Sequence, residues 1–244
     1  MTGGDLMLVT RERYLTNTFK GTGISDGIAT GRLCYFTRYT FDNMPARSDF
    51  PEREIDKWIN AVTVSCEQLV VLSRITKRYA GSGMAALFEA HLGMLADVEF
   101  GDRVSELIHS EGYSAEAAIH RTAQEFYDMF AAIDDEYMSA RCMDVIDIAI
   151  RVLGNMVGYE VDYSSFARDC IISSSFLTPS EAANMMFYGA AGFVLSYANE
   201  YSHTAILART LGVPLVSGVD ADRSISFVGA EATINGSTGE VSFQ

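Results

Sequence analysis

One of the four histidines in this 244-residue chain lies in a polar run at the expected start of a helix. The stretch is "NEYSHTAILARTLGVP", residues 199–214, in which His203 stands between Ser202 and Thr204. A helix that begins there would present unpaired N–H groups and a partial positive charge, which together favour an anion. The two hydroxyls would add donors, and neutral imidazole is a competent nucleophile near neutral pH. These features suit a histidine that carries a phosphoryl group.

Other roles for this histidine were compared on the same residues. The sequence has no H-E-x-x-H motif and no Cys/His cluster for a metal, and it has no G-x-S-x-G turn of a serine hydrolase. Polar neighbours argue against a histidine packed in the core. From the residues alone, an ordinary histidine in a helix-capping loop stays the favoured interpretation, and the phosphoryl carrier stays open beside it.

The elements around His203 follow a pattern that changes twice along the chain. Residues 22–38 predict short strands separated by glycine turns, and residues 51–158 predict four helices with short connections. From residue 169, short strands, "SISFVG" among them, alternate with a helix capped by Thr178 and Glu181 and with a helix over 203–211. The predicted fold class is therefore α/β with an inserted all-α helical bundle. Residues 1–45 and 159–244 are assigned to the α/β part and 46–158 to the bundle, with 1–18 expected as a loose extension.

The amino-acid composition indicates which classes of binding partner and which cellular compartment to expect. Acidic residues outnumber basic ones 32 to 18, so the formal net charge is −14, which disfavours nucleic acid and anionic membranes. No apolar segment is long enough to span a membrane, and the N-terminus lacks the pattern of a signal peptide. The four cysteines form no C-x-x-C pair. A reduced, cytoplasmic protein is expected.

Several motifs, taken in chain order, resemble one family. "SHTAILARTLGVPLVSG" resembles the phosphohistidine signature of phosphoenolpyruvate-utilising enzymes. "GTGISDGIATGRLCYF", "ALFEAHLGMLADVEF" and "DDEYMSARCMDVIDIAIRVLGNMVG" are similar to successive stretches in the N-terminal domain of the Enzyme I family of bacterial sugar phosphotransferase systems. The resemblance runs from about residue 21 to the end. It implies a swivelling α/β phosphohistidine domain whose helical insertion docks the phosphocarrier protein HPr.

The resemblance also implies roles for particular residues. His203 corresponds to the histidine that takes a phosphoryl group from phosphoenolpyruvate and passes it to HPr, with Ser202, Thr204 and Arg209 in support. Three residues are expected on the partner-binding side: Glu89, His91 and Arg141. No metal or cofactor is expected on this chain. Mg²⁺ is expected only with the family's phosphoenolpyruvate-binding barrel domain, supplied in cis or in trans.

Two alternatives remain; the first follows from Asn199 and Glu200, which stand where the family has paired glycines, whereas the long helical insertion argues against the second. One is a catalytically weakened or inactive Enzyme I-like module that serves in binding or regulation. The other is the phosphohistidine domain of a dikinase-like enzyme.

Overall fold

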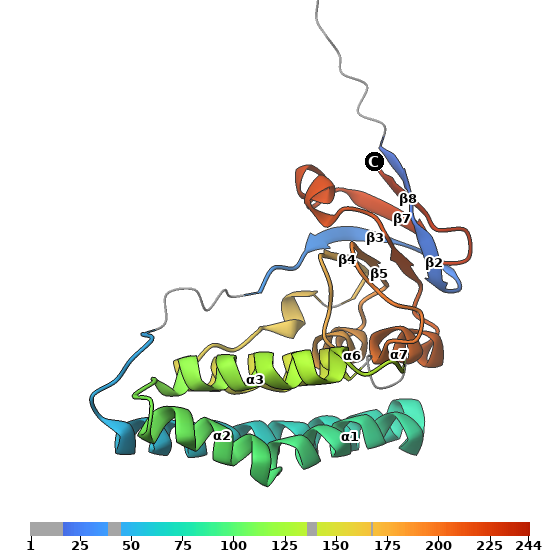
Figure 1. Cartoon of the computed structure of the whole chain (residues 1–244). Coiled ribbons are helices and arrows are strands. Elements are labelled where there is room, and N and C mark those ends of the chain that lie inside the picture. Colours follow the sequence, from blue (N-terminus) through green and yellow to red (C-terminus); the bar gives the residue numbers. More distant parts are fainter. Residues whose placement is uncertain (1–16, 39–44, 136–140, 167) are drawn as a thin grey trace, which may run out of the picture.

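Strands from both ends of the chain form one mixed sheet in the computed structural model, which describes residues 17–38, 45–135, 141–166 and 168–244. The described residues give eight strands in the order β1-β8-β7-β3-β4-β5-β6-β2, with β3, β4, β5 and β6 parallel and the other pairs antiparallel. The two outermost strands are consecutive in the chain and are separated only by Gly21, so the sheet curls toward closure (Figure 1). The bounds of the eight strands are β1 Thr18–Lys20, β2 Thr22–Ser25, β3 Ile28–Tyr35, β4 Cys170–Ser174, β5 Gly192–Leu195, β6 Leu215–Ser217, β7 Glu231–Asn235 and β8 Glu240–Phe243.

The parallel strands are apolar on both faces because each face packs on a different core. Ile171, Val194 and Val216 point into the concave side, where Ile234 and Phe243 join them. The alternate positions pack on the helices instead: Cys170, Ile172, Phe193, Leu195 and Leu215. Strands buried on both faces have apolar residues at consecutive positions, as in Cys170–Ile172 of β4 and in "GFVL" of β5.

The helical layer consists of four helices among the described residues: α1 Pro51–Leu95, α2 Val98–His109, α3 Ala115–Ala131 and α5 Cys142–Val157. Pro51 occupies the first turn of α1, where its missing N–H costs nothing, and the side chain of Ser114 caps α3. Helix α1 is interrupted at Gly81 (φ 87°, ψ 173°), where the first predicted helix ends, and the second predicted helix, over 83–100, covers the rest of α1 and the first turn of α2. Helix α2 was not predicted separately; the side chain of Asp97 caps it.

Two short helices lie between the sheet and the helical layer (Figure 1). Helix α6 (Pro179–Tyr188) begins with the predicted capping box of Thr178 and Glu181. Helix α7 (His203–Leu211) ends at Gly212, which adopts the left-handed conformation at φ 66°. With these elements the predicted fold class, α/β with an inserted helical bundle, is confirmed.

One predicted strand is wrong, and the residue boundaries of the two parts stay a prediction. The stretch "SISFVG" lies mainly in a 3₁₀ helix, η2 Ala221–Phe227, instead of a strand. The side chain of Asp220 accepts a hydrogen bond from the N–H of Asp222, and the hydroxyl of Ser224 donates to the carbonyl of Ala221. Such local side-chain bonds favour a turn over a strand. A second 3₁₀ helix, η1, spans Tyr163–Phe166. The extension expected over 1–18 falls largely outside the described residues.

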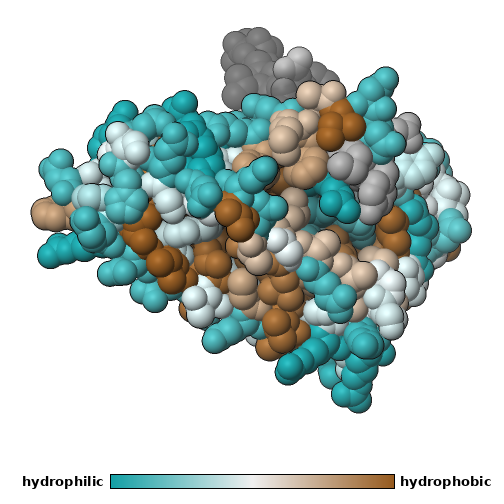
Figure 2. Space-filling view, turned by 60° about the horizontal axis from the view of Figure 1, so that its bottom comes forward, coloured by the Kyte–Doolittle hydropathy of each residue, from teal (hydrophilic) through white to brown (hydrophobic). Residues whose placement is uncertain are grey.

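The surface is hydrophilic over most of the face in Figure 2, and apolar side chains gather in a band across it. Exposed apolar residues of α1 include Ile59, Val64 and Val71. Across the described ranges, no helix combines the length and the apolar character needed to cross a membrane.

Candidate functional site

His203 is the first residue of helix α7, as the sequence predicts. Ser202 caps the helix, because its Oγ accepts a hydrogen bond from the N–H of Ala205 at 3.2 Å. The same hydroxyl donates to the carbonyl of Asn199 at 2.7 Å. Asn199 in turn accepts from the N–H of Tyr201 through its Oδ1. The loop before the histidine is therefore held by its own polar side chains. These hydrogen bonds fix the backbone position from which the imidazole of His203 projects.

A carboxylate from the helical layer contacts the imidazole. Nδ1 of His203 lies 3.1 Å from Oδ1 of Asp144, a residue of α5 that is 3% exposed. Because of this contact the His203 side chain is only 23% exposed, although the polar loop predicts free exposure. An ionised carboxylate can only accept, so Nδ1 carries the hydrogen. In a neutral imidazole this leaves the lone pair on Nε2.

Asp144 is held in its charged form by its surroundings. Burial acts to raise the pKa of this carboxyl group, but the hydrogen bond from His203 and the contact with His91 outweigh it. The pKa of Asp144 therefore lies below its ordinary value. A charged acceptor fixes both the tautomer and the orientation of the ring to which it bonds.

His91 stands behind the same carboxylate and is completely buried. Its Nε2 lies 3.3 Å from Oδ1 of Asp144, and its Nδ1 lies 3.9 Å from Oδ2 of Asp147, although neither ring nitrogen has hydrogen-bond geometry. The expectation that His91 contacts a partner does not fit this position, since its side chain packs inside the fold. Glu89 is exposed on α1, and Arg141 is partly exposed at the N-cap of α5.

The other supporting residues position loops and do not donate to the imidazole. Thr204 is 4% exposed, and its hydroxyl donates to the carbonyl of Leu177 at 3.1 Å. Arg209 donates to the carbonyl of Ile24 at 3.2 Å and to the carbonyl of Glu200. Arg209 thus ties the loop before His203 to strand β2. The hydroxyl of Thr204 and the guanidinium of Arg209 thus donate their hydrogen bonds to backbone carbonyl oxygens.

An open cavity of about 820 Å³ lies beside His203. Met143 and Ile146 of α5 give it an apolar wall, while Ser202 and the loop that contains Asn199 and Glu200 give it a polar one. A cavity of this kind can admit side chains of a second molecule and bring them to Nε2. Among the described residues, no group of three or more His, Cys, Asp or Glu side chains is arranged to hold a metal ion.

The sequence interpretation missed Asp144. The signal that could have found it is the pair Asp144 and Asp147, three residues apart in the apolar helix "CMDVIDIAI". Both carboxyl groups are 3% exposed, and buried carboxylates require partners. Residues at this spacing share one helix face, so the pair predicts a polar contact at the inner side of α5.

Comparisons with known proteins place these residues in a family. The model described as "PEP-utilising enzyme, N-terminal" matches residues 20–141, and the "PEP-utilising enzyme, mobile domain" model matches residues 166–239. The phosphoenolpyruvate-protein phosphotransferase of Bacillus subtilis is 31% identical over 223 residues, which are 91% of this chain and 39% of that protein. That of Mycoplasma capricolum is 30% identical over 206 residues, which are 84% of this chain and 36% of that protein. The chain thus spans about two fifths of the length of these relatives.

Solved structures agree with this assignment. A solution structure of Enzyme I superposes with a TM-score of 0.74 at 28% identity and covers 92% of both chains. The N-terminal domain of the nitrogen Enzyme 1 superposes with a TM-score of 0.64 at 20% identity, a likeness of fold. This chain therefore belongs to the PEP-utilising enzymes, and within them it corresponds to the N-terminal domain of Enzyme I.

Proposed function

We propose that this chain is a phosphoryl carrier domain of a phosphoenolpyruvate-protein phosphotransferase, with His203 as the residue that carries the phosphoryl group. The observation that carries the proposal is the hydrogen bond between Nδ1 of His203 and the carboxylate of Asp144. It directs the Nε2 lone pair away from α5, and it stabilises positive charge that develops on the ring.

In the proposed step, the Nε2 lone pair of His203 attacks the phosphorus of a donor. A new N–P bond forms as the donor's bond to phosphorus breaks, and the donor leaves with that electron pair. The hydrogen stays on Nδ1 of His203 and is donated to the carboxylate of Asp144 throughout. Transfer to an acceptor histidine is the same step in reverse, with the acceptor nitrogen as the new nucleophile.

The partner we propose is a small phosphocarrier protein of the HPr kind, which would bring its own histidine into the 820 Å³ cavity. Phosphoenolpyruvate and Mg²⁺ would act on a separate barrel domain, in cis or in trans. Glu89 and Arg141 remain candidate partner contacts because both are accessible.

Glu200 supports a rival function. In this alternative the chain is an Enzyme I-like module that binds a partner protein without carrying a phosphoryl group. The carboxylate of Glu200 is exposed and lines the cavity beside His203, where it would repel an incoming dianion. The rival predicts docking without phosphorylation.

The test measures phosphorylation directly. The chain is incubated with phosphorylated HPr of Bacillus subtilis and, separately, with phosphoramidate, a small P–N donor that needs no docking. Intact mass in neutral or alkaline buffer should show one added phosphoryl group. His203→Gln should remove it, whereas His120→Gln, at an exposed histidine of α3, should keep it. Docking without added mass from either donor would favour the rival.

A further inference from the structure

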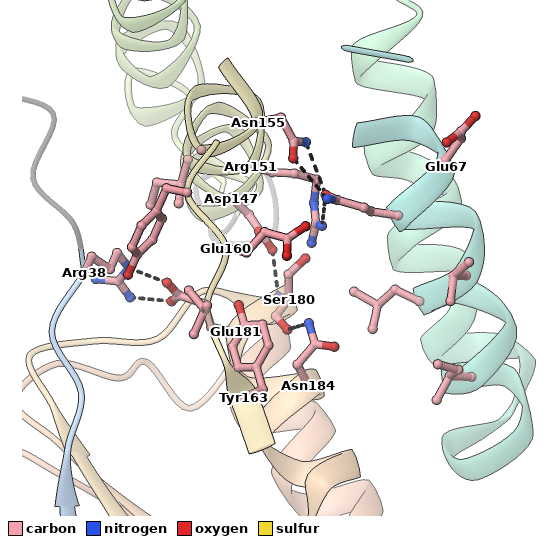
Figure 3. Close-up of a pocket in the computed structure, with 18 residues that line it drawn as sticks. Arg38, Glu67, Asp147, Arg151, Asn155, Glu160, Tyr163, Ser180, Glu181 and Asn184 are labelled. Atoms are coloured by element: carbon pink, nitrogen blue, oxygen red, sulfur yellow. Dashed lines mark hydrogen bonds and ion pairs between the residues drawn. The ribbon is translucent and has the colours of Figure 1, made fainter. Parts of the chain in front are cut away.

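A second cavity, of about 470 Å³, lies where the helical layer meets helix α6, and it shares no lining residue with the cavity beside His203 (Figure 3). Helix α1 forms one wall and α5 forms another. The N-terminal turn of α6 and the connection from Tyr159 to Tyr163 complete it. Here it is called the seam cavity.

Two polar atoms at the inner end of the seam cavity have no hydrogen-bond partner among the described residues. They are Oγ of Ser180, a residue that is 2% exposed, and Nε of Arg151. Their side chains come from α6 and α5 and point toward the same space in Figure 3. A buried donor without a partner destabilises the fold, because it has lost its hydrogen bonds to water without replacement. A ligand that accepts hydrogen bonds from both groups would provide that replacement.

The guanidinium of Arg151 shares the cavity with the buried carboxylate of Asp147, which accepts a hydrogen bond from the N–H of Ser180 at 2.8 Å. Nη1 of Arg151 donates to Oε1 of Gln68 at 2.9 Å, and the guanidinium forms no ion pair with any described residue. The other cation of the cavity, Arg38, is paired with the carboxylate of Glu181. An anionic group is therefore the natural acceptor for Arg151 and Ser180, and a planar carboxylate suits a guanidinium.

The outer part of the seam cavity has the opposite charge. Glu160 is exposed, forms no ion pair within the described ranges, and reaches into the space from the connection after α5 (Figure 3). Glu67, by contrast, points away from the cavity. The remaining wall is aliphatic, from Val71, Leu72 and Ile75 of α1. The seam cavity thus offers a guanidinium and a hydroxyl beside the buried carboxylate of Asp147, the exposed carboxylate of Glu160 and an apolar side.

We propose that the seam cavity binds a small zwitterion of the aliphatic α-amino acid class. Its carboxylate would lie on Arg151 and Ser180, its ammonium group on Glu160, and its side chain on α1. A dianion fits less well because Glu160 would repel it. A simple amine would leave Arg151 and Ser180 without a partner. The volume is within the usual range for small-ligand pockets, about 300–1,000 Å³, and the mixture of apolar wall and few polar groups is typical of them.

Calorimetric titration of the 244-residue chain with L-leucine tests the proposal. Isocaproate, which lacks the ammonium group, and isoamylamine, which lacks the carboxylate, should each bind at least about tenfold more weakly. Equal binding of either half-ligand would overturn the zwitterion. No saturable binding of leucine, valine or isoleucine would overturn the site.

Substitutions of lining residues test whether leucine binds in the seam cavity. Ser180→Ala and Glu160→Gln should each weaken leucine binding about tenfold. Arg74→Gln, at an exposed position of α1 outside the cavity lining, should bind as the wild type does. Because Glu160 is exposed, its variant tests the site even if Ser180→Ala affects folding. Unchanged affinity in both Ser180→Ala and Glu160→Gln would refute the assignment.

Discussion

Nδ1 of His203 and Oδ1 of Asp144 lie 3.1 Å apart, yet the two residues come from different layers of the fold. His203 begins a helix that follows the parallel strand β5, and Asp144 lies in the first turn of α5 in the helical layer. A single hydrogen bond thus joins the candidate nucleophile to the layer that is expected to receive a partner. The contact sets the tautomer of the imidazole and also ties α7 to α5.

The first prediction concerns the tautomer of His203. In Asp144→Asn the neutral amide can accept only a weaker hydrogen bond, so the Nδ1–H form should lose its preference. Imidazole ¹⁵N shifts should show one tautomer in the wild type and a mixture in the variant. The rate of phosphoryl uptake should fall about tenfold. Asp102→Asn, at an exposed position of α2, is the control and should change neither measurement. An unchanged tautomer in Asp144→Asn would contradict the assignment of the proton.

The second prediction is a pH dependence of stability. The pKa of Asp144 is lowered in the folded state, so its contribution is complete above the unfolded value of about 4 and is lost as the pH falls through the folded value. At neutral pH, wild type should exceed Asp144→Asn in free energy of unfolding by about 1–3 kcal/mol. Urea unfolding at a series of pH values should show this difference shrinking below about pH 4. A difference that stays constant to lower pH would mean that Asp144 is not ionised in the folded chain.

The third prediction is that phosphoenolpyruvate with Mg²⁺ does not phosphorylate this chain in the absence of another protein. The substrate is strongly anionic, whereas Glu200 lines the cavity and Arg209 is engaged with two backbone carbonyl groups. Pyruvate release and intact mass are the measurements. Phosphoramidate serves as the positive control for a competent His203. Stoichiometric labelling from phosphoenolpyruvate would place a substrate site on this chain.

The fourth prediction compares two glycines. A Cβ on Gly236, after β7, would overlap with the backbone carbonyl of Ser25, so Gly236→Ala should lower the free energy of unfolding by about 1–3 kcal/mol or more. A Cβ on Gly101, inside α2, would meet nothing within 4 Å. Gly101→Ala should raise stability by about 0.5–1 kcal/mol, because alanine is the better helix former. Thermal unfolding should therefore shift in opposite directions. The same direction in both variants would contradict the packing described for Gly236.

The features that the sequence predicts well are local. The start of α7 at His203 depends on the cap by Ser202 and its end on Gly212, and all three residues lie within one short stretch. The capping box of Thr178 and Glu181 is equally local. Such signals act over three or four residues, so they can be recognised without knowledge of the fold.

The features that the sequence does not reveal depend on packing between distant segments. Asp144 and His203 are 59 residues apart, and they meet only because α5 packs beside the loop that precedes α7. The burial of His91 has the same origin. The alternation of "SISF" predicts a strand in place of η2, whereas the hydrogen bond that Asp220 accepts and the one that Ser224 donates decide the conformation.

The near-closure of the sheet at Gly21 has a consequence for association between chains. The outermost strands, β1 and β2, are only three and four residues long, and each is already paired on one side. Open edges are where foreign strands add to a sheet and where amyloid-like stacking begins. With so little unpaired backbone along the edges of its described sheet, this protein should resist fibril formation, and its partners should recognise side chains instead of extending the sheet by another strand.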